Sequence, residues 1–168
     1  KHIPPSAGLA GGSSDAAAVL KGLRVLWRLK VSDGQLLKLG VSLGSDVSYC
    51  LVGGLCEVAG TGEKVKKLPY KMPEFPVVVV IPEEEKPSTA WAYRYLDEAN
   101  VGKSLKLLRL LKQAIRRQDF AAICQNLHND FEPVMAQKYP VVGAIRQKLL
   151  KYGASGAILA GSGLSMAG

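Results

Sequence analysis

The chain contains 168 residues, of which 48% are hydrophobic and 21% are charged, a composition typical of a folded globular protein with one large domain or two small ones. It has no run of about 18 apolar residues, so we expect no membrane-spanning helix. The formal net charge of +8 would suit a nucleic-acid-binding protein, but the basic residues at 103–117 recur opposite leucines, as on the solvated face of an amphipathic helix. A positive field also favours an anionic small substrate.

The first part of the chain is predicted to fold into helices and then short strands. One of the polar residues Ser13, Ser14 and Asp15 would cap the first helix, and Ser32 has capping-box spacing to Gln35 in the second. The apolar stripe of the first helix consists of Ala16, Val19, Leu20, Leu23, Leu26 and Trp27. The expected elements are helices at 13–29 and 32–44, strands at 47–52 and 55–58, and a turn at 60–62.

The second part is predicted to begin near residue 72, where the prolines within residues 69–76 indicate a domain boundary. A β-branched run at 77–81 predicts a buried strand, and Pro140 and Gly153 suit the first turn and the end of a late helix. Helices and strands in this order predict an α+β protein. The other expected elements are helices at 89–99, 101–117 and 120–131, a strand at 156–160 and a glycine loop at 161–165, with domains at 1–72 and 73–168.

The cysteines predict a reduced, intracellular protein. Cys50, Cys56 and Cys124 form no CxxC pair and are odd in number, which disfavours a disulfide framework. Cys124 and His128 have a spacing that could hold a metal on one helix face, but no second pair of ligands stands near them. We therefore expect buried packing and assign no zinc site. The chain begins without an initiator Met or a signal-peptide pattern, so we expect it to be a piece of a longer protein.

A flexible stretch, residues 3–12, stands directly before the first predicted helix. A helix N-terminus exposes unpaired backbone N–H groups and about half a unit of positive charge, to which phosphate can dock. The small residues remove side-chain bulk, the glycines permit the positive φ angles of an anion-binding loop, and the serines offer hydroxyls to phosphate or magnesium. A plain strand-to-helix connection with a serine cap is the alternative. The candidate phosphate-binding residues are Pro4, Pro5, Ser6, Ala7, Gly8, Leu9, Ala10, Gly11, Gly12, Ser13 and Ser14.

The glycine-rich stretch matches neither common phosphate-binding pattern, because no Lys follows its glycines and GxGxxG does not fit. It resembles another motif: PPSAGLAGGSSDAA is similar to the ATP-binding motif of the GHMP kinases. Three later stretches resemble the same family in the same order, namely LGSDVSYCLVGG, STAWAYRYLD and the segment at 129–165. The additional glycine and the Asp after the serines resemble the motif of those family members that phosphorylate a cytidyl diphosphate alcohol.

The resemblance implies a GHMP kinase-like two-domain α+β fold, with a ribosomal-protein-like N-terminal part and a ferredoxin-like C-terminal part. It also implies that the fold is incomplete here, since the family's first strand would precede Lys1 and a closing strand and helix would follow Gly168. The implied co-substrate is ATP with Mg2+, and the implied partner is a small cytidyl diphosphate substrate rather than nucleic acid or a membrane. The implied protein is a monomer or homodimer of the bacterial cytoplasm or of a plastid. We expect the 168-residue piece alone to have little activity.

The resemblance also implies roles for individual residues. Asp46 would be the catalytic base, although the residues alone equally favour Asp46 as a helix cap after Gly44. Thr89 lies in the stretch that meets the acceptor, with helix capping as the alternative. A last glycine loop would pack beside the phosphate site, unless it is only a tight turn; its residues are Gly161, Ser162 and Gly163.

Two other functions stay open from the sequence. One is a different GHMP kinase, acting on homoserine, mevalonate or a sugar, and the other is a basic RNA-binding module. The sequence also departs from the family: Ser48 replaces a Pro, and Leu164 and Met166 replace other residues in the last glycine loop.

Overall fold

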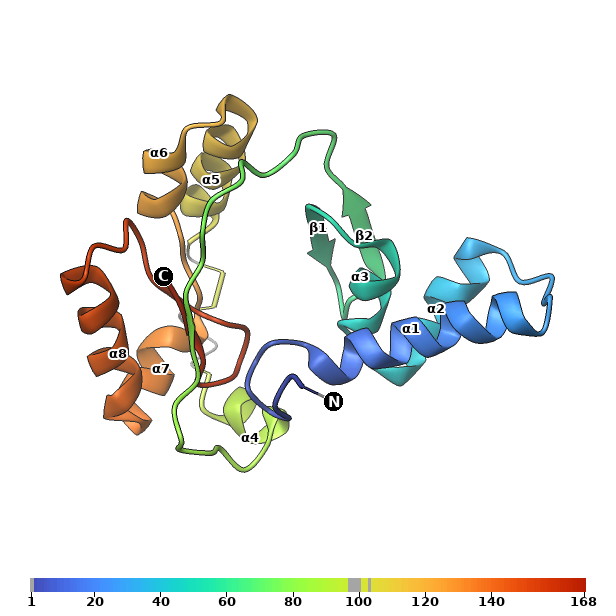
Figure 1. The fold of residues 1–168 in the computed structure, drawn as a ribbon, viewed down its shortest axis with the longest axis horizontal. Coiled ribbons are helices and arrows are strands. Elements are labelled where there is room, and N and C mark those ends of the chain that lie inside the picture. Colours follow the sequence, from blue (N-terminus) through green and yellow to red (C-terminus); the bar gives the residue numbers. More distant parts are fainter. Residues whose placement is uncertain (1, 97–100, 103) are drawn as a thin grey trace. The chain divides into compact units, whose positions relative to one another are not determined.

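The computed structural model describes residues 2–96, 101–102 and 104–168, and its mixture of helices and strands confirms the predicted α+β class (Figure 1). The chain divides into two compact units. Unit 1 consists of residues 2–9 and Met72–Gly168, and unit 2 consists of Ala10–Lys71. Residues 2–9 are therefore grouped with the later part of the chain, whereas the sequence-based domains placed 1–72 together. No helix in the described ranges is both long and apolar enough to cross a membrane.

Unit 2 packs helices beside a β-hairpin. The buried residues Ala17, Leu36, Val47 and Leu51 form its core. Ser32 and Gln35 form the predicted capping box of the second helix. The elements are α1 (Gly11–Leu26), α2 (Asp33–Leu43), α3 (Val47–Val52), β1 (Cys56–Ala59) and β2 (Lys64–Lys67). Helix α3 packs against both α1 and α2, and β1 pairs with β2 in antiparallel fashion, which confirms the strand expected near 55–58.

Two expectations for unit 2 are wrong. Residues 47–52 form the helix α3 instead of a strand, because Val47 and Leu51 are buried together against the neighbouring helices, a spacing that a helix provides. Helix α1 begins and ends earlier than predicted. Its apolar stripe is also only partly covered, since Leu20 and Leu23 are half-buried whereas Leu26 is 73% exposed.

Unit 1 builds a small antiparallel sheet, and two of its helices pack against strands of this sheet. The strands lie in the order β3 (Val79–Val80), β5 (Met166–Ala167), β4 (Ile158–Leu159). Met166 pairs with Val80 on one side and with Leu159 on the other. Its buried side chain forms one core with Met135, Val142 and Leu159. Helix α7 packs against α8 and β4, α8 packs against β5, and α5 packs against α6. The helices are α4 (Thr89–Arg94), α5 (Leu105–Arg117), α6 (Phe120–Gln125), α7 (Phe131–Lys138) and α8 (Pro140–Lys151).

Several expectations for unit 1 need correction. The helix expected at 120–131 ends at Gln125 as α6, where the Asn126 side chain donates to Ala122 O. Helix α7 begins only at Phe131 and was not predicted. The strand expected at 77–81 narrows to β3, and Val78 is 58% exposed instead of buried. In α5, Ile115 is buried as expected but Leu108 is exposed. Helix α4 ends at Arg94, and residues 97–99 of the predicted helix lie outside the described residues. Strand β5 was not predicted.

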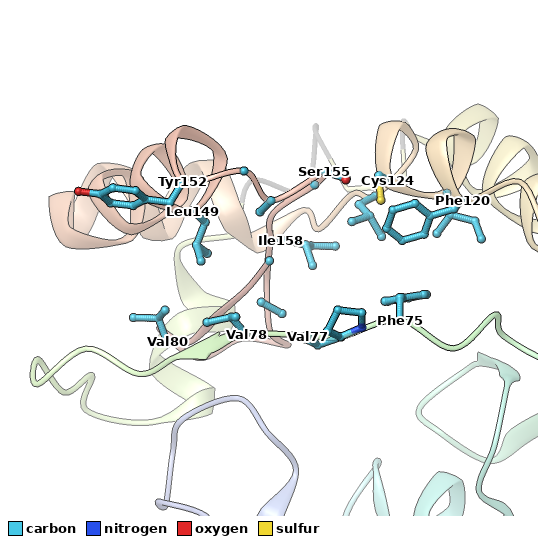
Figure 2. Close-up of a pocket in the computed structure, with 18 of the residues that line it drawn as sticks. Phe75, Val77, Val78, Val80, Phe120, Cys124, Leu149, Tyr152, Ser155 and Ile158 are labelled. Carbon is cyan, nitrogen blue, oxygen red and sulfur yellow. The ribbon is translucent and has the colours of Figure 1, made fainter.

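Val77 and Val78 line a large apolar cavity, which accounts for their exposure. Its volume is about 1080 Å³, and it lies between residues 72–80, α6 and α8. Figure 2 shows Leu149, Ile158 and Phe120 on one side, facing Val77 and Val78 on the other. The predicted site residues are not part of its lining. Cys124 is, and burial raises the pKa of its thiol.

Candidate functional site

The N-terminus of α1, in unit 2, presents the backbone donors that an anion needs. Ala10 precedes the helix with φ 51° and ψ 26°, and no side chain caps the first turn. The Ser14 N–H donates to Ala10 O at 2.9 Å, so the helical ladder begins there, and the preceding N–H groups have no place in it. The first turn contains no acidic residue, so the positive end of the helix dipole is not neutralised by its own side chains.

The serines of this turn do not cap the helix, contrary to the sequence-based expectation. The left-handed conformation of Ala10 starts the helix at Gly11, which places Ser13 and Ser14 inside the first turn. The Ser14 hydroxyl donates to Gly11 O at 2.8 Å. A hydroxyl that donates in this way keeps its lone pairs, so Ser14 can still accept a hydrogen bond or bind a cation.

The preceding half of the glycine loop belongs to unit 1, where it packs against the last glycine turn. Ser6 and Gly8 have φ values of 58° and 83°. A Cβ atom at Gly8 would overlap Ala160 O and lie 2.8 Å from Gly163 N, and one at Gly161 would lie 3.0 Å from Gly8 O. The two glycine segments therefore meet backbone to backbone, with no room for side chains. The tight-turn alternative for Gly161–Gly163 is compatible with this contact, because Gly163 N–H donates to Ala160 O at 3.2 Å.

Asp46 lies in unit 2, at the residue before α3, and is exposed. Its carboxylate makes no capping hydrogen bond, so the cap alternative lacks its defining contact. Burial raises the pKa of the Cys50 thiol, the charge of Asp46 adds to the rise, and the charge of Lys21 opposes it. Asp46 and Lys21 of α1 therefore both act on one side chain where α1 and α3 pack together.

Ser48 holds the segment that carries Asp46. It is fully buried, and its hydroxyl contacts Gly62 O and lies 3.2 Å from Ser45 O. Gly62 has φ +105°, and a Cβ atom there would overlap the backbone of Ser45, so the hairpin turn packs directly against the residue before Asp46. Sequence reasoning noted Ser48 only as a replacement for Pro. The signal for its role was the hydroxyl itself, which can bond to nearby carbonyls as a proline ring cannot.

We expect Ser48→Ala to lower the free energy of unfolding by about 1–3 kcal/mol, because it leaves the buried contact to Gly62 O without its donor. Urea denaturation of the complete protein measures the loss. Ser42→Ala is the matched control, since its exposed hydroxyl donates only locally, to Leu39 O, and it should change stability by less than about 0.5 kcal/mol. Equal losses in the two variants would contradict the role given to Ser48.

Thr89 and a buried lysine flank the start of α4 in unit 1. Ser88 caps α4 by accepting the Trp91 N–H at 3.0 Å, which leaves Thr89 exposed at the first helical position and not acting as the cap. Lys86 is only 5% exposed, and its ammonium has no hydrogen-bond partner among the described residues. Burial lowers the pKa of Lys86. Sequence reasoning missed Lys86, because it follows a run of exposed glutamates that suggests a solvated segment.

Two family models match the chain. The model for the GHMP kinases N terminal domain matches residues 1–54, and the model for the GHMP kinases C terminal matches residues 111–164. The chain belongs to the GHMP kinase family. In this GHMP kinase chain the first match contains the glycine loop, α1 and Asp46, and the second contains the Gly161–Gly163 turn.

Curated relatives extend the likeness over the whole chain. Proteins named 4-diphosphocytidyl-2-C-methyl-D-erythritol kinase are 40% identical in Shouchella clausii, 41% in Geobacillus kaustophilus and 41% in a Synechococcus strain, each over 100% of this chain. The chain spans 55%, 57% and 56% of the length of these three relatives, so it corresponds to little more than half of each.

Solved structures confirm the GHMP kinase-like fold. A crystal structure of 4-(cytidine 5'-diphospho)-2C-methyl-D-erythritol kinase matches with a TM-score of 0.81 at 33% identity, over 100% of this chain and 59% of that one. A homoserine kinase from Cytophaga hutchinsonii matches with a TM-score of 0.81 at 21% identity, over 99% of this chain and 57% of that one. The second likeness is one of fold alone.

Proposed function

We propose that the complete protein transfers the γ-phosphoryl group of ATP to the hydroxyl at carbon 2 of 4-diphosphocytidyl-2-C-methyl-D-erythritol, in the synthesis of isoprenoid precursors. Relatives at 40% and 41% identity over the whole chain carry the name of this kinase. The observation that carries the proposal is the uncapped N-terminus of α1, preceded by positive φ angles at Ser6, Gly8 and Ala10. Such a terminus offers backbone donors and a positive dipole to phosphate.

In this proposal the loop from Gly8 to Ser14 holds the triphosphate. Magnesium, when bound, would neutralise the charge of the phosphates. The described residues contain no cluster of three or more His, Cys, Asp or Glu that could hold a metal alone. His128 pairs with Asp130 at 2.7 Å, and Cys124 faces the apolar cavity. Phosphate oxygens together with a hydroxyl of Ser13 or Ser14 form a donor set of the kind that magnesium accepts.

Asp46 is proposed to accept the proton of the acceptor hydroxyl. An alcohol is a weak nucleophile, and phosphoryl transfer depends mainly on positioning and on charge neutralisation. The absence of a capping bond leaves the Asp46 carboxylate available for that proton. Thr89 is proposed to contact the acceptor, and the turn at Gly161, Ser162 and Gly163 to support the phosphate side. The proposed partner is an anionic small molecule rather than nucleic acid, and the formal net charge of +8 is compatible with it.

The test uses the complete protein with ATP and Mg2+ and compares three acceptors: the cytidyl substrate, homoserine and mevalonate. We expect kcat/KM for the cytidyl substrate to exceed that for the others by at least about 100-fold. Preference for another acceptor would replace the proposed substrate. Strongly salt-dependent RNA binding without affinity for ATP would instead support the RNA-binding alternative.

A further inference from the structure

Strand β4 ends at an outer edge of the sheet, where its backbone bonds to side chains. Ala160 N–H donates to Ser165 O at 2.8 Å, on the side that faces β5. The polar groups of the preceding residue, Leu159, therefore point away from β5. Glu132 Oε2 accepts the Leu159 N–H at 3.0 Å, and Asn129 Nδ2 donates to Leu159 O at 2.9 Å. Two side chains thus occupy the place of a neighbouring strand.

Asn129 differs from Glu132 because it also reaches the glycine turn. Its Nδ2 donates to Gly161 O at 2.7 Å, while its Oδ1 accepts the Phe131 N–H at 2.9 Å. The bond from Phe131 fixes which end of the amide faces the two carbonyls. The amide therefore uses both of its donors to join the end of β4 to Gly161, which has φ 55°.

The Gly161–Gly163 turn packs directly against Ala7 and Gly8 of the glycine loop. A Cβ atom at Gly163 would overlap the Ala7 carbonyl and the Gly8 nitrogen, and one at Gly161 would lie 3.0 Å from Gly8 O. Closely packed backbone transmits displacement, because there are no flexible side chains between the segments to absorb it. A shift of Gly161 is therefore passed to Ala7 and Gly8.

We propose that Asn129 is a positioning residue for nucleotide binding: its amide fixes the Gly161–Gly163 turn, and the turn fixes the Ala7–Gly8 half of the glycine loop. This inference rests on the proposed kinase function. It assigns a defined hydrogen-bonding role to Asn129, the first residue of the 129–165 segment that resembles the family. Asn129 acts through the loop and does not touch the reacting atoms.

The test compares Asn129→Asp with Glu132→Ala in the complete protein. The aspartate keeps the shape of the side chain but turns a donor toward two carbonyls into a repelling carboxylate oxygen. Glu132→Ala instead removes the acceptor of the Leu159 N–H and the partner of Arg146, and leaves the Gly161 contact in place. We expect Asn129→Asp to raise KM for ATP by about tenfold, with kcat at saturating ATP and KM for the acceptor each within about threefold of wild type. Glu132→Ala should lower Tm by at least as much as Asn129→Asp does, but it should change KM for ATP by less than about twofold.

Calorimetric affinity for a non-hydrolysable ATP analogue is measured in parallel. Equal changes of nucleotide affinity in the two variants, or an unchanged affinity in Asn129→Asp, would overturn the positioning role. Asn129→Ala, which removes the donors without adding charge, replaces Asn129→Asp if the latter does not fold. A wild-type protein that binds the analogue but does not phosphorylate the cytidyl substrate would refute the proposed function while leaving this comparison valid. A wild-type protein without affinity for the analogue would overturn both.

Discussion

Replacing Asp46 by Asn in the complete protein should lower kcat by a factor on the order of 10² or more and leave the affinity for ATP within about twofold. The amide keeps the size of the carboxylate but cannot accept the proton of the acceptor hydroxyl. Asp46 is exposed and makes no capping bond to α3, so the substitution removes no helix cap. Steady-state kinetics give kcat, and calorimetry with a non-hydrolysable analogue gives the affinity.

Asp33→Asn is the matched control for this experiment. Asp33 lies in the first turn of α2, its side chain is 89% exposed, and it pairs with Arg24 on the surface. An exposed ion pair of this kind contributes little, so kcat should stay within about twofold of wild type. If Asp46→Asn turns over as fast as Asp33→Asn, Asp46 is not the base. If it loses ATP affinity in step with kcat, Asp46 acts in binding instead.

The features that were predictable from sequence are those decided by groups a few residues apart. The capping box of Ser32 and Gln35 closes within one helical turn, and the proline at the start of α8 acts through its own fixed φ. The same holds for the glycine loop before α1. Its small residues and the following helix are contiguous in the chain, so their chemistry can be inferred before any tertiary contact is known.

The features that could not be predicted depend on distant partners. Helix α3 looks like a strand by its valines and its tyrosine, and it is helical because Val47 and Leu51 complete a core with Ala17 and Leu36. The role of Ser48 depends on the hairpin turn at Gly62, and that of Asn129 on Gly161. For Ser48 and Asn129, a polar side chain bonds to a backbone carbonyl whose position is fixed only by the fold.

Gly163→Ala should reduce kcat/KM for ATP by a factor on the order of 10² in the complete protein, because a displacement of about 1 Å in a binding loop can cost that much. Gly163 is not among the glycines with a left-handed φ, so its φ does not exclude alanine. Space is the obstacle, since the new Cβ atom would overlap the backbone of Ala7 and Gly8. Neither backbone can yield as a flexible side chain would, so the loop itself has to move.

Gly143→Ala separates this effect from the general consequences of replacing glycine. Gly143 lies within α8, and a Cβ atom there would meet nothing within 4 Å. Alanine is favoured over glycine inside a helix by about 1 kcal/mol, so this variant should be more stable than wild type and bind ATP normally. The two substitutions add the same methyl group within unit 1. Only Gly163→Ala should lower kcat/KM for ATP. Normal ATP kinetics in Gly163→Ala would show that the contact between the glycine segments does not shape the nucleotide loop.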